Sequence, residues 1–143
     1  MDDEGLDLIR REPDTASAIL ALQLAAESLG EARVRFSRRD YTAALELSRN
    51  AMRLASSALL FRDGCVCPTL ESASSYLAWR YPGSFPLDEW ERLESIPIED
   101  SPGLYNMILS ALGKLKKAGE QEATDALSAA SIFIESARAE MMG

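Results

Sequence analysis

The stretch from Asp40 to Gly64 constrains the fold most, because its pattern predicts one long helix with apolar residues on several sides. Small side chains recur along it at alternating spacings of three and four, forming a stripe that another helix can approach closely. Larger apolar residues flank this stripe and repeat every seven residues: Leu45, Met52 and Leu59 on one side, and Leu47, Leu54 and Phe61 on the other. A helix of this kind needs several neighbours, as the central helix of a bundle has.

A second long helix is predicted from about Asp14 to Arg39, where apolar residues recur at spacings of four and three. Asp40 can cap the next helix after a very short turn, so the two helices should form an antiparallel hairpin. Gly30 lies inside the first of them and suggests close approach of another backbone or a slight bend. Three further apolar residues give this helix more apolar width than one neighbour covers: Ile19, Leu20 and Leu24. We therefore expect a second contact there, within the bundle or across a dimer.

The rest of the chain predicts shorter helices followed by two longer ones. Helical spacing over 69–81 and a helix start at Pro86 predict the short helices. The longer helices are expected over 101–118, with Ile108 among the inward residues, and over 120–141. No stretch predicts a convincing strand. The expected fold is therefore all-α, an up-and-down bundle of four to five helices with one or two short helices inserted after the second long helix.

Length and composition favour one domain without a membrane span. The chain has 143 residues, 47% of them hydrophobic, which is enough for one proper core. Residues 1–13 are acidic and predict a flexible arm, and residues 14–143 predict the bundle. No apolar run approaches the roughly 20 residues that span a bilayer, and no secretory signal precedes the bundle, so a cytoplasmic location is expected. The net charge of -8 argues against broad DNA binding.

The absence of histidine from the sequence limits the chemistry that this chain can carry out. A Ser or Cys nucleophile has no imidazole base beside it, and a di-iron bundle lacks its histidine ligands. Cys65 and Cys67 are one residue apart, a spacing that strains a mutual disulfide and leaves a metal site short of ligands. The glycines are scattered and form no phosphate-binding loop. We therefore expect no catalytic residue, no metal and no cofactor.

Several weak sequence elements, taken in their order and separation, resemble a known family of helical domains. They are Asp40-Tyr41 with Ala44, then Ala51, Ala55, Ala58-Leu59-Leu60 and Gly64, and near the C-terminus Ala126, Ala130 and Phe133-Ile134. From Asp14 onward the chain is similar to the HEPN family, named for higher eukaryotes and prokaryotes nucleotide-binding. The resemblance implies a bundle of four or five helices, usually dimeric, often encoded beside a small nucleotidyltransferase, as in toxin-antitoxin pairs. Many members are ribonucleases that use an Arg followed a few residues later by a His.

The ribonuclease motif is missing here, because lysines and a glycine stand where the Arg and His would fall. The resemblance therefore implies a non-catalytic module that dimerises and binds a partner protein, with a small nucleotidyltransferase as the candidate. The expected interface consists of the apolar residues outside the central stripes: Ile19, Leu20, Leu24, Leu47, Leu54 and Phe61.

Two other interpretations of the sequence stay open. One is a nucleotide- or RNA-binding HEPN domain with weak or no ribonuclease activity, which uses a basic patch on phosphates. Its candidate contacts are Arg49, Asn50, Arg53, Lys114, Lys116 and Lys117. Against it, Arg49 and Arg53 are four residues apart and can pair with Glu46 or with acids on an adjacent helix. The other interpretation is an unrelated helical interaction bundle, which the helix topology would distinguish.

Overall fold

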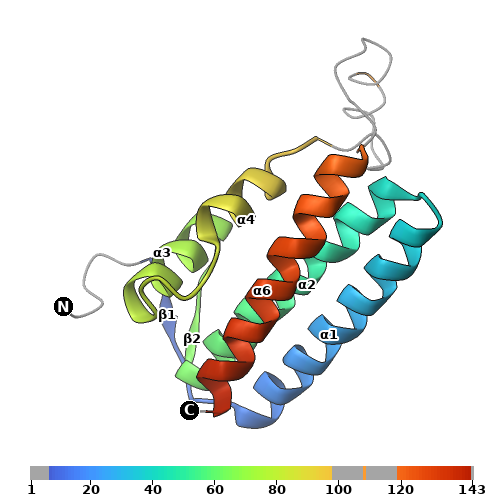
Figure 1. The fold of residues 1–143 in the computed structure, drawn as a ribbon. Helices are drawn as coiled ribbons and strands as arrows, with labels where there is room; N and C mark the ends of the chain where they lie inside the picture. The colour runs from blue at the N-terminus through green and yellow to red at the C-terminus, as the bar shows by residue number, and fades with distance from the viewer. Residues whose placement is uncertain (1–6, 98–107, 109–118, 143) are drawn as a thin grey trace.

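The computed structural model describes residues 7–97, 108 and 119–142. Within them the chain forms five helices and two very short strands, so the expectation of an all-α fold is confirmed (Figure 1). In chain order the elements are β1 (Ile9–Arg10), α1 (Thr15–Ser37), α2 (Tyr41–Asp63), β2 (Cys65–Val66), α3 (Leu70–Arg80), α4 (Leu87–Glu94) and α6 (Glu120–Met142). Among these helices, none combines the length and the apolar character that a bilayer crossing needs.

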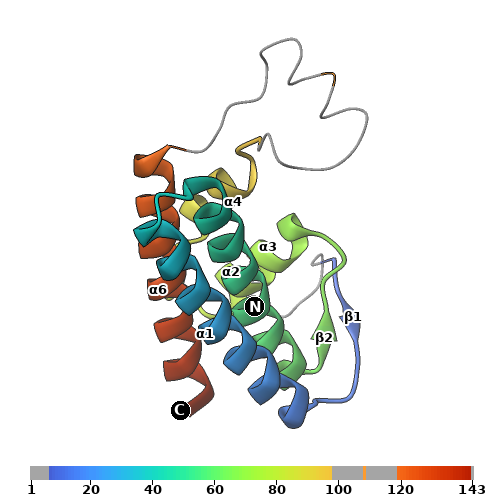
Figure 2. The same cartoon turned by 90° about the vertical axis from the view of Figure 1, so that its right-hand side faces the viewer.

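The three long helices lie side by side, and the short ones cover one flank of α2. Helix α2 packs against both α1 and α6, while α1 also touches α6. Helices α3 and α4 lie beside α2 on the side away from α1, as the second view shows (Figure 2). The expected order, a long hairpin followed by short helices and a long last helix, is thus present in the part of the chain that the structure describes.

Local capping groups set the ends of the α1–α2 hairpin. The backbone N–H of Ala43 donates to the carboxylate of Asp40 at 3.2 Å, which satisfies one free donor at the start of α2. Arg39 takes a left-handed conformation, with φ of 62°, and lets the chain reverse within three residues. At the other end, Gly64 caps α2 in the left-handed conformation, as its position in the sequence predicts.

The core forms where α2 meets α6 and α4. The small stripe and the Leu45, Met52 and Leu59 flank of α2 are fully buried, as expected. Phe133 of α6 is also fully buried and lies 4.8 Å from the Phe85 ring, centroid to centroid. Trp90 of α4 packs edge-on against Phe133 at 5.0 Å. This aromatic group fixes α4 over the centre of the bundle.

No other backbone approaches Gly30 closely in the described part of the chain. Among the described residues, no atom lies within 4 Å of the place where its Cβ would stand. The idea that another backbone approaches α1 closely there is therefore wrong for this chain by itself. Gly30 sits on the exposed side of the helix, where it only lowers helix propensity.

The expectation that the chain forms no strand is wrong. Ile9 and Arg10 pair antiparallel with Val66 and Cys65, and the N–H of Arg11 donates to the Gly64 carbonyl at 2.8 Å. Residues 9–11 are thus held to the end of α2, unlike the loose arm that their composition predicts. The strands are too short to carry an alternating pattern, and they form because Gly64 turns the chain toward this segment.

One predicted helix lies almost wholly outside the described residues. Of the stretch 101–118 the structure describes only Ile108, which is helical and 49% exposed. The expectation that Ile108 faces inward is therefore wrong. The three candidate phosphate-binding lysines also lie outside the described residues: Lys114, Lys116 and Lys117. The last helix begins where the sequence predicts, at Glu120.

Candidate functional site

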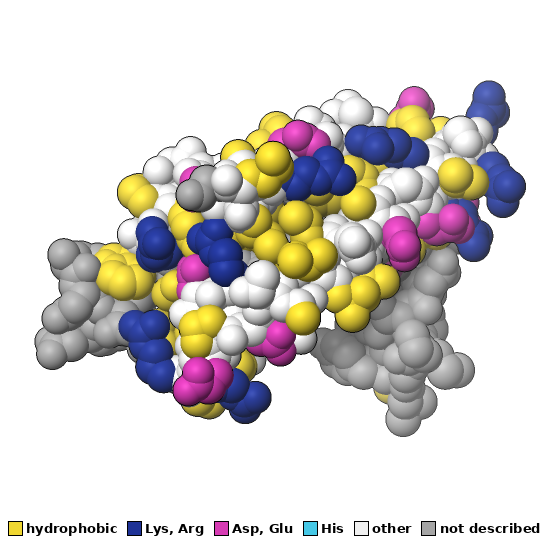
Figure 3. Space-filling model, turned by 90° about the horizontal axis from the view of Figure 1, so that it is seen from below, with side chains coloured by type: hydrophobic (Ala, Val, Ile, Leu, Met, Phe, Trp, Pro, Cys, Tyr) yellow, Lys and Arg dark blue, Asp and Glu magenta, His cyan; other side chains and the backbone are white. Residues whose placement is uncertain are grey.

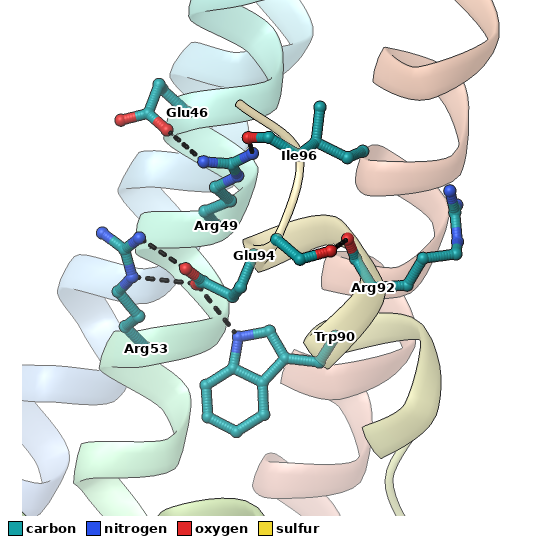
Figure 4. A network of polar contacts seen from close by, with 8 residues as sticks. Glu46, Arg49, Arg53, Trp90, Arg92, Glu94 and Ile96 are labelled. Atoms are coloured by element: carbon teal, nitrogen blue, oxygen red, sulfur yellow. Dashed lines mark hydrogen bonds and ion pairs between the residues drawn. The ribbon is translucent and has the colours of Figure 1, made fainter. Parts of the chain in front are cut away.

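The arginines expected to contact phosphate lie in a polar cluster between α2 and the end of α4 (Figure 4). The Arg49 side chain is only 7% exposed and lies 3.0 Å from the carboxylate of Glu46. Its other terminal nitrogen donates to the backbone carbonyl of Ile96, just past α4. Burial lowers the pKa of Arg49, and the charge of Glu46 opposes that effect. Arg49 therefore fixes the chain after α4 against α2.

Arg53 makes a two-pronged ion pair with Glu94 of α4. Its Nε and Nη2 donate to the two carboxylate oxygens at 2.8 and 2.6 Å. The indole N–H of Trp90 donates to the same carboxylate at 3.3 Å. Hydrogen bonding to Glu94 raises the pKa of Arg53, since the bond favours the charged form. The Glu94 side chain is 9% exposed and the Arg53 side chain 51%, so the arginine covers the carboxylate from solvent.

Asn50 points away from this cluster. Its side-chain amide donates to the hydroxyl of Ser28 at 3.2 Å, and Ser28 donates to the carbonyl of Leu47 at 2.7 Å. This chain of hydrogen bonds ties α1 to α2 midway along the hairpin. The structure therefore brings Arg49 and Arg53 together, separates Asn50 from them, and pairs both arginines with acids. Such pairing, with Glu46 or with acids on an adjacent helix, is the alternative to phosphate binding that the sequence leaves open for these arginines.

A shallow hollow of about 240 Å³ lies beside the Arg53–Glu94 ion pair, between α2 and the start of α3. Its lining combines apolar groups, such as Leu60 and Trp90, with small polar ones, such as Ser57 and Cys67. Burial raises the pKa of the Cys67 thiol to about 11, with the neighbouring Cys65 adding to the effect. A thiol of this kind is protonated near neutral pH and is a poor nucleophile.

A smaller hollow of about 130 Å³ adjoins the first and shares Ser57, Leu60 and Cys67 with it. Its remaining lining comes from Phe61, Cys65 and Val66. The sequence predicts neither hollow, because both depend on the path of residues 65–69 beside α2. The nearby sequence signals are Gly64 and Pro68, which predict that the chain leaves α2 and turns here but do not predict a hollow.

A buried polar network surrounds the C-terminal end of α2. The hydroxyls of Tyr76 and Tyr81 donate to the same oxygen of Asp63 at 2.8 and 2.5 Å. Burial raises the pKa of both tyrosines, and the hydrogen bonds to Asp63 add to the effect. Arg62 donates to the Tyr81 hydroxyl at 2.6 Å and also to the carbonyl of Glu140 on α6. Each of these groups has a partner within the chain, so the network holds α2, α3 and α6 together.

The predicted interface residues divide between two surfaces. Leu20, Leu24 and Phe61 are exposed, while Leu47 and Leu54 are half-buried beside them. Ile19 is exposed too, but it lines a separate groove between α1 and α6 with Leu22 and Met141. Ile19 therefore does not lie on the same surface as the other predicted interface residues. The name apolar face is used below for Leu20, Leu24, Leu47, Leu54 and Phe61.

A hydrogen bond across the hairpin and helical spacing together place the five residues of the apolar face on one side, since Leu20 is four residues before Leu24 and Phe61 seven after Leu54. Leu24 lies one turn before Ser28 on α1, and Leu47 and Leu54 lie within one turn of Asn50 on α2. Because Asn50 and Ser28 are hydrogen-bonded, their two flanks meet. Seen from below, hydrophobic side chains gather near the middle of the surface, with charged ones around them (Figure 3).

The part of the chain that the structure describes has no group of three or more acidic or thiol side chains placed to hold a metal ion. The arrangement instead offers paired charges, two shallow hollows and an exposed apolar face. Comparisons of the chain with models of protein families, with curated proteins and with solved structures find no match.

Proposed function

We propose that this chain is a non-catalytic, HEPN-like interaction module that forms a homodimer through the apolar face. The observation that carries the proposal is the exposure of three large apolar side chains on one side of the hairpin. Leu20 is 55% exposed, Leu24 40% and Phe61 41%. Contiguous exposed apolar groups on a folded domain mark sites of protein contact more often than scattered ones do.

The dimensions of the hairpin suit a dimer interface. Helices α1 and α2 each contain 23 residues, so each is about 35 Å long at a rise of 1.5 Å per residue. Two helices packed side by side are roughly 20 Å wide, which gives a face of about 700 Å². A standard protein interface buries about 800 Å² on each partner. The hairpin alone therefore supplies most of the area that a stable dimer needs.

The charges around the apolar face do not oppose self-association, although the whole chain carries a charge of -8. Arg53 of α2 is paired with Glu94 of α4. Arg35 pairs with Glu31 at 3.1 Å farther along α1. Two copies can therefore approach through this face without bringing isolated like charges together.

The helix order is consistent with the HEPN-like part of the proposal. The resemblance implies a long hairpin packed against the last two helices, with short helices between. The hairpin, the short helices and the last helix follow in that order, and the penultimate helix lies outside the described residues. The same resemblance adds a small nucleotidyltransferase as a second partner, which would bind the dimer. A phosphate-binding role has less support, because Arg49 and Arg53 already pair with Glu46 and Glu94.

Sedimentation velocity tests the dimer. We expect the wild-type chain to be dimeric at micromolar concentration and Leu24→Glu to be monomeric, because a charge would be buried in the interface. Ile132→Glu is the matched control, since Ile132 is 52% exposed but lies on α6, at the groove with α4. It should leave the dimer intact. A wild-type chain that stays monomeric up to about 100 µM would refute the proposal.

A further inference from the structure

We propose that the two copies meet about a two-fold axis near the C-terminal half of α2, so that Phe61 of each copy enters the smaller hollow of the other. This inference rests on the proposed dimer and specifies its arrangement. It starts from an exposed aromatic side chain that stands directly beside an apolar hollow on the same molecule.

The hollow fits an aromatic ring in size and in chemistry. Its volume is about 130 Å³, and an apolar cavity of about 150 Å³ is known to take up benzene. Leu60 and Val66 supply apolar walls, and Ser57 stands at the boundary with the larger hollow. Within the described part of the chain, the lining residues carry no acidic or basic group. A phenyl ring entering it would bury no charge.

Among the residues that the structure describes, Phe61 is the side chain best placed to fill such a hollow in another copy. It is 41% exposed, although it belongs to the flank on which Leu47 and Leu54 are half-buried. It cannot fill the hollow of its own molecule, because it forms part of the wall. The groove between α1 and α6 is larger, about 390 Å³, but Glu27 and Arg138 border it. An aromatic ring would fit that groove less well.

Symmetry then fixes the place of the axis. In an interface between identical copies, a residue and its contact site exchange roles across the two-fold axis. Since Phe61 and Ser57 are one helical turn apart, the axis must pass close to this turn of α2. The two α2 helices would cross there, with β2 of each copy beside the other.

The remaining apolar residues have suitable positions around that axis. The N–H of Asp14 donates to the carbonyl of Phe61 at 2.9 Å, which sets the start of α1 beside the end of α2. Leu20 is six residues past Asp14, and Leu54 is seven residues before Phe61. At 1.5 Å per residue, both lie about 10 Å from the Phe61 level and would be covered. Leu47 lies about 20 Å away and would contribute less.

Two arginines near the axis already have charged or polar partners. Arg62, next to Phe61, lies 3.3 Å from the carboxylate of Asp63 and donates to Tyr81. Arg53, on the far side of Ser57, is held by Glu94. Closing the two copies over Phe61 therefore requires neither arginine to lose its partner, which keeps the cost of desolvation small.

The experiment removes the aromatic side chain in one variant and fills the hollow in another. Phe61→Ala should weaken the dimer at least about tenfold in sedimentation equilibrium, as expected for a buried aromatic anchor. Ser57→Trp should weaken it too, because the indole would occupy the hollow that receives Phe61. The control, Ile19→Ala, removes a similarly exposed apolar group from the α1–α6 groove and should change the dimer little.

Mixing the two variants gives the decisive measurement. A heterodimer would still place one intact Phe61, from the Ser57→Trp chain, into the hollow of the Phe61→Ala chain, which keeps its other lining residues but loses the Phe61 wall. We expect the mixture to form more heterodimer than the Ser57→Trp chain forms homodimer, measured with one variant carrying a mass tag. Circular dichroism should show unchanged helix content in both variants, since Phe61 and Ser57 lie at the surface.

The outcomes separate this inference from the dimer proposal. A wild-type monomer would end both. A wild-type dimer that Leu24→Glu disrupts, but that neither Phe61→Ala nor Ser57→Trp weakens, would leave the dimer in place and overturn the arrangement around Phe61. Equal weakening by Leu47→Ala and Phe61→Ala would also overturn it, because Leu47 lies about 20 Å from the proposed axis.

Discussion

Replacing Gly64 by alanine tests how strongly the end of α2 holds the N-terminal segment. Gly64 has φ of +74°, and an added Cβ would stand 2.5 Å from the carbonyl oxygen of Arg11 and 3.1 Å from the ring of Pro13. The left-handed conformation costs an alanine about 1–2 kcal/mol. The clash involves backbone, so β1 must shift and lose the bond from Arg11 to Gly64, for about 1 kcal/mol more.

We therefore expect Gly64→Ala to lower the free energy of unfolding by about 2–3 kcal/mol, measured by urea denaturation followed at 222 nm. Two other glycines separate the contributions. Gly83 has φ of +76° but open space around its Cβ position, so Gly83→Ala should cost only the conformational part, about 1–2 kcal/mol. Gly30 is helical and unobstructed, so Gly30→Ala should stabilise the chain by about 0.5–1 kcal/mol.

The comparison between Gly64→Ala and Gly83→Ala decides the matter. If the two variants lose the same stability, the contact between Gly64 and the Arg11 backbone contributes nothing, and the reasoning about the docked segment is refuted. If Gly64→Ala loses more, exchange of the Arg11 amide hydrogen should also speed up in that variant, because its acceptor has moved.

Three further perturbations have defined outcomes. Arg49→Ala should cost about 2 kcal/mol in urea denaturation, because it leaves the Ile96 carbonyl without its donor. Arg53→Ala should cost about 1–3 kcal/mol, because it removes both hydrogen bonds to the nearly buried Glu94 carboxylate. Phe133→Ala should cost about 3–5 kcal/mol and weaken the near-ultraviolet circular dichroism of the packed aromatic rings. The pKa of Cys67 is raised to about 11, so the folded chain holds this proton more tightly than the unfolded chain; its contribution to stability is complete below about pH 8.5 and is lost as the pH rises toward 11. Cys67→Ser should flatten the alkaline part of a plot of unfolding free energy against pH, and an unchanged slope would contradict the assignment.

The long helices could be predicted from the sequence because the signals for them are local. Asp40 and Gly64 mark the two ends of α2 by capping, and both groups act on atoms within a few residues. The spacing of Leu45, Met52 and Leu59 identified a buried flank, because a helix repeats its faces regularly whatever surrounds it. These features follow from backbone geometry, so the sequence by itself determined the hairpin and the all-α class.

The partners of each side chain depended on the tertiary structure. The sequence left open whether Arg49 and Arg53 contact phosphate or pair with acids, because Glu94 is 41 residues away from Arg53 along the chain. It also grouped Ile19 with Leu20, although packing of α6 against one edge of α1 puts the two on different surfaces. The hollow beside Phe61 and the pairing of β1 with β2 depend in the same way on segments that meet only after folding. Local periodicity fixes which face of a helix is apolar, but only packing between distant segments decides which of those faces is covered.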